Sequence, residues 1–209
     1  MSTAASAVRT TSRVAALTLG LLTVLATVAV AQAETALPRV RVLATGGTIA
    51  GAQASATDYG YKSGAYDVNT LIKAVPNLDK LAQITGEQVA SIGSQDMNDE
   101  VWLKLAKRLN TVLAGADVDA VLITHGTDTL EETSYFLSLV TKSAKPVVMV
   151  GSMRPATATS ADGPGNIYNG VAVAITPQAM GRGTLVELND EFHYARNVVK
   201  TDTTSVQTF

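Results

Sequence analysis

From Pro38 onward, short apolar runs alternate along the chain with longer stretches in which polar and apolar residues mix. Short runs rich in Val, Ile and Leu and bounded by turn residues are typical of strands buried in a sheet. Runs of this kind occupy residues 40–44, 88–92, 120–124, 146–150 and 184–188. The pattern therefore predicts a strand at each of these places.

Between these runs, the spacing of apolar residues predicts helices. The clearest is 98–113, where one face carries only aliphatic side chains: Val101, Leu105, Leu109, Val112 and Leu113. Asn98 is placed to cap the first turn of this helix, and Gly115 to end it. Shorter helices are expected at 67–75, from about 129, and at about 166–175. Thr129 and Glu132, three residues apart, predict a capping box on the second of these.

The alternation of strands and helices predicts an α/β fold with an open, mostly parallel sheet and flanking helices. A polar stretch rich in Gly, Pro, Ser and Thr, residues 151–165, is interpreted as a long loop. In sheets of this kind, ligands bind beyond the carboxyl ends of the strands. The turns that follow the predicted strands are therefore the places to look for chemistry.

The first 33 residues differ in composition from the rest of the chain. Arg9 and Arg13 precede an uncharged run that is rich in Leu, Val and Ala and ends in Ala-Gln-Ala, which is typical of a secretory signal peptide. The alternative is a membrane anchor, but the run is close to the lower length limit for a span and contains several Thr and Gly residues. We expect a signal peptide at 1–33, cleaved after Ala33, and a soluble periplasmic or secreted domain at 34–209. After cleavage, no membrane partner is expected.

Composition narrows the possible chemistry. The chain is 46% hydrophobic and 16% charged, which is enough apolar material for a sizeable core. A formal net charge of −2 gives no electrostatic reason to expect nucleic acid or an anionic membrane as a partner. The absence of cysteine excludes a disulfide, a thiolate nucleophile, a lipoprotein anchor and a cysteine metal site. With only His125 and His193 present, a histidine-rich zinc site is not expected.

Three of the predicted strands end in turns rich in hydroxyl side chains and glycine, at residues 44–50, 92–99 and 124–129. Because the carboxyl ends of parallel strands meet at one edge of a sheet, we expect these turns to lie close together. A hydroxyl nucleophile, a carboxylate and glycine-exposed backbone N–H groups are what an acyl-transfer site needs. The three turns together therefore indicate a candidate acyl-transfer site.

Each turn also has a purely structural interpretation. Gly46 and Gly47 can simply make a tight turn after a strand. Neither the dinucleotide fingerprint nor the phosphate-loop spacing is present, so a nucleotide-binding protein is disfavoured. Asp128 can be a charge at a helix N-terminus, although the predicted capping box leaves it without an obvious structural role. His125, at the end of a strand, is interpreted as a structural histidine rather than a general base.

Six motifs resemble the bacterial type II L-asparaginase family, in order and at family-like spacing over about residues 38–209. They are ATGGTIAG at 44–51, GEQVASIGSQDMND at 86–99, ITHGTDTLEET at 123–133, KPVVMVGSMRP at 145–155, SADGP at 160–164 and KTDTT at 200–204. Six motifs in order are far more specific than any one alone. The resemblance implies that residues 34–209 are the N-terminal catalytic domain of this family, with a flavodoxin-like layering of sheet and helices.

The resemblance also implies catalytic roles. Thr48 resembles the family's primary nucleophile, which attacks the substrate carboxamide and forms an acyl-enzyme. Tyr61, placed by its spacing from Thr48, resembles the tyrosine that helps to activate it. Thr127, Asp128 and Lys200 resemble a second catalytic cluster, in which the lysine assists deprotonation of a hydroxyl or water. The carboxylate of this cluster holds the lysine and the substrate ammonium.

Other residues resemble substrate contacts of the family. Ser94 and Gln95 are expected to hold the α-carboxylate and α-amino groups of the substrate, and the backbone N–H groups of Thr48 and Thr127 to form the oxyanion hole. The full set of expected substrate contacts is Gly47, Ser94, Gln95, Thr127 and Asp128. The resemblance implies no metal and no cofactor.

The chemistry of the substrate agrees with these roles. A free amino acid carries one ammonium, for which Asp128 supplies a counter-charge. A threonine hydroxyl has too high a pKa to attack unaided, and either Tyr61 or Lys200 can assist it. Residues 94–96 resemble the asparagine-preferring members, so we expect L-asparagine as the main substrate. Glutamine should be a weaker one, because one methylene discriminates by only about 1–3 kcal/mol.

Members of this family continue into a second, smaller α/β domain, which is expected to be absent from this chain. That domain completes the active site of a neighbouring subunit with an acidic residue. We therefore expect a homo-oligomer, a dimer of dimers, for the full-length protein, and little asparaginase activity from these 209 residues alone. The alternative function is a non-catalytic periplasmic module that binds asparagine or aspartate through Ser94, Gln95 and Asp128.

Overall fold

A six-stranded sheet with helices on both faces forms the centre of the unit Leu37–Phe209. The computed structural model describes residues 36–55, 58 and 60–209. The signal peptide expected at 1–33 lies outside the described residues. No helix in the described part of the chain combines the length and the hydrophobicity needed to cross a membrane.

The secondary structure alternates between strands and helices along the chain. The strands of the main sheet are β1 Arg39–Gly46, β4 Gln83–Ile92, β5 Ala120–Thr124, β6 Val147–Val150, β7 Thr184–Leu188 and β8 Glu191–Tyr194. A separate two-stranded ribbon consists of β2 Ala52–Gln53 and β3 Tyr61–Lys62. The α-helices are α2 Val68–Lys73, α3 Asp99–Ala114, α4 Leu130–Val140 and α5 Gly163–Ala174. Short 3₁₀ helices are η1 Thr48–Ala50, η2 Leu78–Lys80, η3 Ser94–Asp96, η4 Thr127–Thr129 and η5 Pro177–Ala179.

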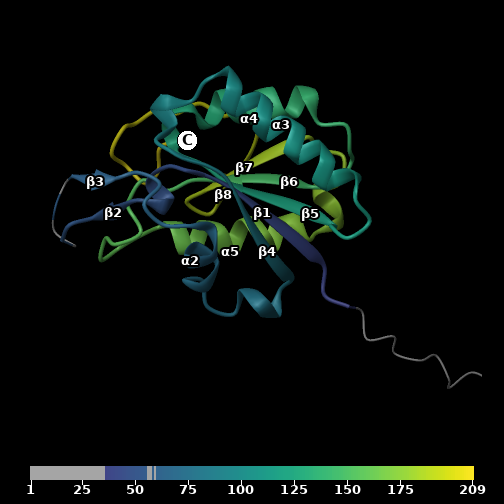
Figure 1. Ribbon diagram of the computed structural model, residues 1–209, viewed down its shortest axis with the longest axis horizontal. Helices are drawn as coiled ribbons and strands as arrows, with labels where there is room; N and C mark the ends of the chain where they lie inside the picture. The colour runs from purple at the N-terminus through teal and green to yellow at the C-terminus, as the bar shows by residue number, and fades with distance from the viewer. Residues whose placement is uncertain (1–35, 56–57, 59) are drawn as a thin grey trace, which may run out of the picture. The chain divides into compact units, whose positions relative to one another are not determined.

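The strand order in the sheet is β4-β1-β5-β6-β7-β8. The first five strands are parallel, and β8 returns antiparallel to β7. Helices α3 and α4 cover one face and α2 and α5 the other (Figure 1). The chain steps from β1 to β4 on one side and then to β5 on the other. The direction of winding thus reverses between β1 and β5, where doubly wound folds bind their ligands.

Two hydrophobic clusters, one on each face, hold these layers together. Val40, Val42 and Ala44 of β1 pack towards α2 and α5, whereas Leu43 between them packs towards α3 and α4. This alternation follows from the period of two in a strand. Strands β5 and β6 are buried along their whole length, as expected for central parallel strands with helices on both faces.

The prediction of an α/β fold with a mostly parallel sheet is confirmed. The clearest predicted helix is also confirmed, since α3 begins after Asn98, whose side chain accepts a hydrogen bond from the N–H of Val101. Four of its five predicted face residues are buried, and Val101 is half-buried. Helix α2 is capped by Asp67, whose carboxylate accepts from two backbone N–H groups.

Two predicted boundaries were wrong. Strand β4 begins at Gln83 rather than at residue 88, because it is an edge strand whose first half has polar, partly exposed residues. Helix α5 begins at Gly163 rather than at residue 166, so the preceding loop is shorter than predicted. Pro164 lies in the first turn, where a missing N–H costs nothing.

The predicted capping box at Thr129 was also wrong. No side-chain cap is present at the start of α4. The hydroxyl of Thr129 instead donates to the backbone carbonyl of Ser94, 2.9 Å away. A tertiary contact therefore replaces the local one that the sequence spacing favours.

The hairpin from β7 to β8 was not predicted. It turns through Asn189 and Asp190, both with positive φ (54° and 64°), which matches the two-residue turns that join antiparallel strands. Strand β8 has only four residues, and most of them are exposed. Its sequence therefore carries no buried apolar run by which to recognise it.

Candidate active site

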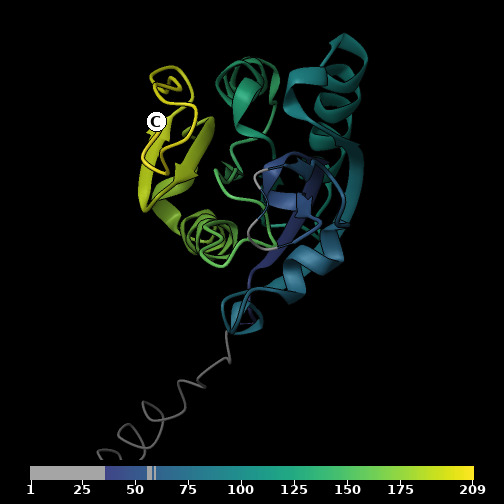
Figure 2. The same ribbon diagram turned by 90° about the vertical axis from the view of Figure 1, so that its left-hand side faces the viewer.

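The turns after β1, β4 and β5 lie at one edge of the sheet, as predicted. Each turn continues as a single 3₁₀ turn, η1, η3 and η4 respectively. Figure 2 views the molecule from this side, with the β2–β3 ribbon and the C-terminal segment on the same side as the turns. Thr48, Ser94 and Thr127, one from each turn, are 8%, 5% and 4% exposed, so their hydroxyl groups lie in a largely dry environment.

Glycine allows the turns after β1 and β5 to touch through their main chains. Gly47 has a φ of 81°, and a Cβ atom there would lie 2.4 Å from the Cα of Gly126. Its N–H donates to the carbonyl of Ile92 at 2.8 Å, which ties the turn to the end of β4 as well. Glycine is thus required at position 47, because a side chain there would collide with Gly126. The interpretation of Gly46 and Gly47 as a tight turn after a strand agrees with this geometry.

Ser94 connects the turn after β4 to the turn after β5. Its hydroxyl accepts the backbone N–H of Asp128 at 3.0 Å, and its carbonyl accepts from Thr129. A Cβ atom on Gly126 would lie 2.5 Å from the Ser94 hydroxyl. Ser94 therefore lies against the second turn, at the place where the sequence predicts a substrate contact.

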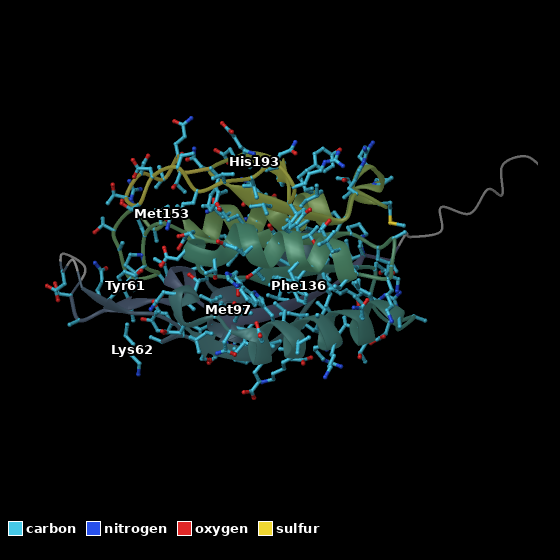
Figure 3. The ribbon with its side chains drawn as sticks, turned by 90° about the horizontal axis from the view of Figure 1, so that it is seen from above. Tyr61, Lys62, Met97, Phe136, Met153 and His193 are labelled. Atoms are coloured by element: carbon cyan, nitrogen blue, oxygen red, sulfur yellow. The ribbon has the colours of Figure 1, made fainter. Side chains whose placement is uncertain are left out.

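Thr48 and Tyr61 form a hydrogen-bonded pair. The hydroxyl of Thr48 lies 2.6 Å from the phenol oxygen of Tyr61, and either can donate. Tyr61 comes from β3 of the ribbon, is 42% exposed, and lies with Lys62 at the same end of the molecule as Met153 (Figure 3). Gly51 lies beneath its ring, since a Cβ atom there would lie 2.7 Å from Tyr61 Cδ2. The structure thus pairs the predicted nucleophile with the predicted tyrosine.

Thr127, Asp128 and Lys200 form a second polar cluster. Lys200 donates from Nζ to the Thr127 hydroxyl at 2.9 Å and to the Asp128 carboxylate at 2.6 Å. The Lys200 side chain is 14% exposed and that of Asp128 is 54% exposed. An ammonium group this close to a hydroxyl stabilises a negative charge that develops on it. The three residues predicted to act together are therefore in direct contact.

Gln95 is the expected site residue with the weakest connection to the others. Its side chain is exposed, folds over Gly93 and donates to Asp96 at 3.4 Å. It does not hydrogen-bond to the Thr48 pair or to the Lys200 cluster. The structure thus brings together two clusters and Ser94, and leaves the Gln95 side chain exposed at the same edge.

Histidine 125 is structural, as predicted. It is fully buried, and a chain of hydrogen bonds joins it to Trp102 and Thr133. Because a carbonyl can only accept, the proton of the neutral ring is on His125 Nδ1, which donates to Gly126 at 2.6 Å. His125 Nε2 then accepts from the Thr133 hydroxyl, which in turn accepts from the indole N–H of Trp102. This network supports the turn that carries Thr127.

Acid should destabilise the domain through His125. Burial lowers the pKa of this imidazole to about 4 from its usual 6.5, although the Gly126 carbonyl partly opposes the shift. The unfolded chain therefore binds one more proton between these pH values, and stability is lost as the pH falls from 6.5 through 4. The loss is about 3 kcal/mol. In urea unfolding between pH 3.5 and 7.5, the difference in unfolding free energy between His125→Gln and the parent should shift in favour of the variant as the pH falls.

The chain's other histidine provides the matched control. His193 lies on β8, and its side chain is 23% exposed. His193→Gln should follow the parent at every pH. A His125→Gln profile that runs parallel to that of the parent would contradict the assignment of this pH dependence to His125.

Glu131 is a site residue that the sequence did not reveal. Its carboxylate accepts the backbone N–H of Lys200, 69 residues away in the chain. The only local signal is an acidic residue in the first turn of a helix, which is common at helix N-termini and has no special meaning there. In the described part of the chain, no group of three or more His, Asp or Glu side chains is arranged to hold a metal ion.

Comparison with known proteins places this arrangement in a family. Residues 39–209 match the family model described as "Asparaginase, N-terminal". The chain is 58% identical to L-asparaginase 2 of Bacillus subtilis over 174 residues, which are 83% of this chain and 46% of that protein. It is 51% identical to the glutaminase-asparaginase of Pseudomonas fluorescens over 170 residues, 81% of this chain and 47% of that protein.

Two further relatives differ in the location that their names give. A probable periplasmic L-asparaginase of Haemophilus influenzae is 57% identical over 173 residues, 83% of this chain and 49% of that protein. The crystal structure of a probable cytoplasmic L-asparaginase from Campylobacter jejuni superposes with a TM-score of 0.80 at 52% identity, covering 82% of this chain and 52% of that one. The chain spans about half the length of the curated relatives that it matches.

Proposed function

This chain belongs to the asparaginase family, whose N-terminal domain it matches over residues 39–209, and on that premise we propose that it carries the nucleophile of an amidohydrolase that converts L-asparagine to L-aspartate and ammonia. The observation that carries the proposal is the 2.6 Å contact between the Thr48 hydroxyl and the Tyr61 phenol. A buried hydroxyl paired with a second acid–base group, beside a lysine cluster, is the arrangement that nucleophilic catalysis requires.

In the first half-reaction, Thr48 Oγ1 forms a bond to the carboxamide carbon and its proton moves towards Tyr61. The pairing favours Tyr61 over Lys200 as the first group to assist Thr48, because Lys200 Nζ is hydrogen-bonded to Thr127 and Asp128 instead. The carbonyl π electrons move to the oxygen, which the backbone N–H groups of Thr48 and Thr127 stabilise. Collapse of this intermediate breaks the C–N bond, and the nitrogen leaves as ammonia after it regains a proton.

In the second half-reaction, water attacks the acyl-enzyme and restores the Thr48 hydroxyl. The Lys200 ammonium, 2.9 Å from the Thr127 hydroxyl, lowers the cost of negative charge on the oxygen that receives or relays a proton. Because Lys200 is only 14% exposed, bulk water screens this effect weakly. The two clusters thus serve the two halves of a ping-pong reaction.

Recognition of the amino-acid part of the substrate is assigned to the open side of the same edge. The Asp128 carboxylate is 54% exposed, so an incoming ammonium can reach it without displacing Lys200. The hydroxyl of Ser94 and the amide of Gln95 supply uncharged donors for the α-carboxylate, with Gly47 at the floor of the site. We propose asparagine as the better substrate and glutamine as the weaker one, in a family whose members include proteins named for both activities.

Export and self-association are also proposals. The pattern at 1–33 favours a periplasmic or secreted protein. One relative is named as periplasmic, and one solved structure is named as a cytoplasmic protein. A dimer of dimers is proposed for the full-length protein by resemblance to the family. No metal or cofactor is proposed for the reaction.

The proposal is tested by assaying this chain beside a hybrid in which residues 39–209 replace the matching part of the Bacillus subtilis relative. The hybrid should release ammonia and aspartate in equal amounts from asparagine. Its kcat/KM for glutamine should be lower by about tenfold or more, as one methylene allows. The chain alone should turn over little, but aspartate should raise its melting temperature because Ser94 and Asp128 are already in place.

The outcomes separate the two functions. A folded hybrid that binds aspartate but hydrolyses neither amide would favour the non-catalytic binding module over the enzyme. Absence of both hydrolysis and aspartate binding would contradict both. Full asparaginase activity of the chain alone would overturn the expectation that this site is incomplete by itself.

A further inference from the structure

The segment that carries Lys200 meets the hydrophobic core at its two ends, through Val198 and Phe209. It follows β8, and the hydrogen bonds made by Thr201, Asp202 and Thr208 lie within the segment itself. Residues 201–205 are exposed. These internal hydrogen bonds do not use the main-chain N–H of Lys200, whose partner comes from another part of the chain.

Glu131 is that partner. Its carboxylate accepts the backbone N–H of Lys200, while the other end of the same lysine donates to Thr127 and Asp128. Residues 127–131 thus hold both the main chain and the ammonium group of Lys200. Because Glu131 lies in the first turn of α4, directly after η4, it is rigidly connected to the two residues that the ammonium must reach.

The neighbouring acid, Glu132, shows that the contact is specific. Both residues lie in the first turn of α4, and both carry a charge that favours the helix N-terminus. Glu131 is half-buried and bonded to Lys200, whereas Glu132 is exposed. Both acids can therefore stabilise the N-terminus of α4, whereas the hydrogen bond to Lys200 is made by Glu131.

We propose that Glu131 is a positioning residue for Lys200, which fixes the lysine main chain so that Nζ stays on Thr127 and Asp128. Glu131 acts through Lys200 and does not touch the reacting atoms. The proposal rests on the proposed function, since it concerns the same lysine cluster. A charge-assisted hydrogen bond to a backbone N–H is about twice as strong as a neutral one, which suits it to fix one point of a loop.

The placement of Lys200 can be measured without any assay of activity. Limited acetylation of the chain, followed by peptide mass mapping, gives the modification rate at Lys200. Glu131→Ala should raise this rate about tenfold, because the loss of one charge-assisted hydrogen bond frees the lysine. Glu131→Gln keeps an acceptor at the same distance, so its rate should stay within about twofold of the parent, as should that of Glu132→Ala.

The consequence for catalysis is measured in the hybrid protein. Glu131→Ala should lower kcat by about 10- to 100-fold, as supporting partners of catalytic groups typically do, with a smaller change in KM. Glu131→Gln should recover most of the rate, and Glu132→Ala should retain it. A purely structural role would instead lower the melting temperature and leave kcat per folded molecule and Lys200 labelling unchanged.

The two proposals fail in different ways. If the parent hybrid does not hydrolyse asparagine, the proposed function fails, and the labelling of Lys200 still decides the role of Glu131. Equal labelling of Lys200 in the parent and in Glu131→Ala overturns the positioning role. Should Glu131→Ala not fold, Glu131→Asp gives the same comparison, because it keeps the charge but withdraws the carboxylate by one methylene. A labelling rate above that of the parent supports the proposal, and an unchanged rate overturns it.

Discussion

Replacement of Thr48 with valine should lower the rate of asparagine hydrolysis by about a thousandfold or more, as the loss of an essential nucleophile does in other hydrolases. Valine keeps the branched shape but removes the oxygen that lies 2.6 Å from Tyr61. The domain should remain folded, because Tyr61 is 42% exposed and its phenol can bond to water instead. Ammonia release by the hybrid protein and its melting temperature measure the two effects separately.

Two variants make this result specific. Thr48→Ser retains a hydroxyl on the same atom and should keep measurable activity. Tyr61→Phe leaves the nucleophile in place and removes only its partner, so it should cost less than Thr48→Val. Substantial turnover by Thr48→Val would show that another group, with Thr127 as the first to examine, forms the acyl-enzyme.

Replacement of Glu187 with glutamine should remove most of the alkaline sensitivity of the fold. Burial raises the pKa of this carboxyl on β7 to about 8 from its usual 4.5. Hydrogen bonds from Asn169 and from the Asp190 backbone oppose the shift, whereas the charges of Asp190 and Asp162 add to it. The folded chain therefore holds a proton between these pH values that the unfolded chain has lost. Stability is lost as the pH rises from 4.5 through 8, by about 5 kcal/mol in all.

Urea unfolding of the parent and of Glu187→Gln at pH 5, 7 and 9 tests this expectation. The difference in unfolding free energy should be small at pH 5 and should grow with pH in favour of the variant. Glu191→Gln on β8, where the side chain is 54% exposed, is the matched control and should follow the parent. If the unfolding free energy of Glu187→Gln changes with pH in parallel with that of the parent, the Glu187 carboxyl is not the cause of the alkaline sensitivity.

The two buried groups have opposite effects between pH 4.5 and 6.5. In that range His125 in the folded chain lacks a proton that the unfolded chain binds, whereas Glu187 holds a proton that the unfolded chain has lost. The two groups therefore change the free energy of unfolding in opposite directions as the pH changes, and the stability of the parent should be nearly constant in this range. His125→Gln removes one pH dependence of the unfolding free energy and leaves that of Glu187, and Glu187→Gln does the reverse. Each variant must therefore be compared with the parent at every pH.

Much of the fold could be predicted because its signals are local. The apolar runs that became β5, β6 and β7 are too short for helices, and the cap at Asn98 is within one turn of the helix it starts. The convergence of the three turns followed from the geometry of parallel strands alone. The same rule brought Thr48 and Thr127 to one edge, although 79 residues separate them.

What could not be predicted depends on contacts between distant segments. The capping box at Thr129 failed because the Ser94 carbonyl, which local spacing cannot reveal, competes for the threonine hydroxyl. Glu131 bonds to a lysine 69 residues away. The sequence around Glu187 gives no sign that its carboxyl is buried in the fold. The role of Tyr61 came from the family resemblance and not from its neighbours, since β3 is only two residues long.

The hydrogen bonds that support the Thr127 turn begin at the chain's single tryptophan. Trp102 donates to Thr133, which donates to His125, which in turn donates to the carbonyl of Gly126 next to Thr127. Indole fluorescence responds to the polarity and hydrogen bonding around the ring. The molecule therefore contains an optical probe connected to its own candidate site, and the binding of a ligand at that edge can be followed without attaching a dye.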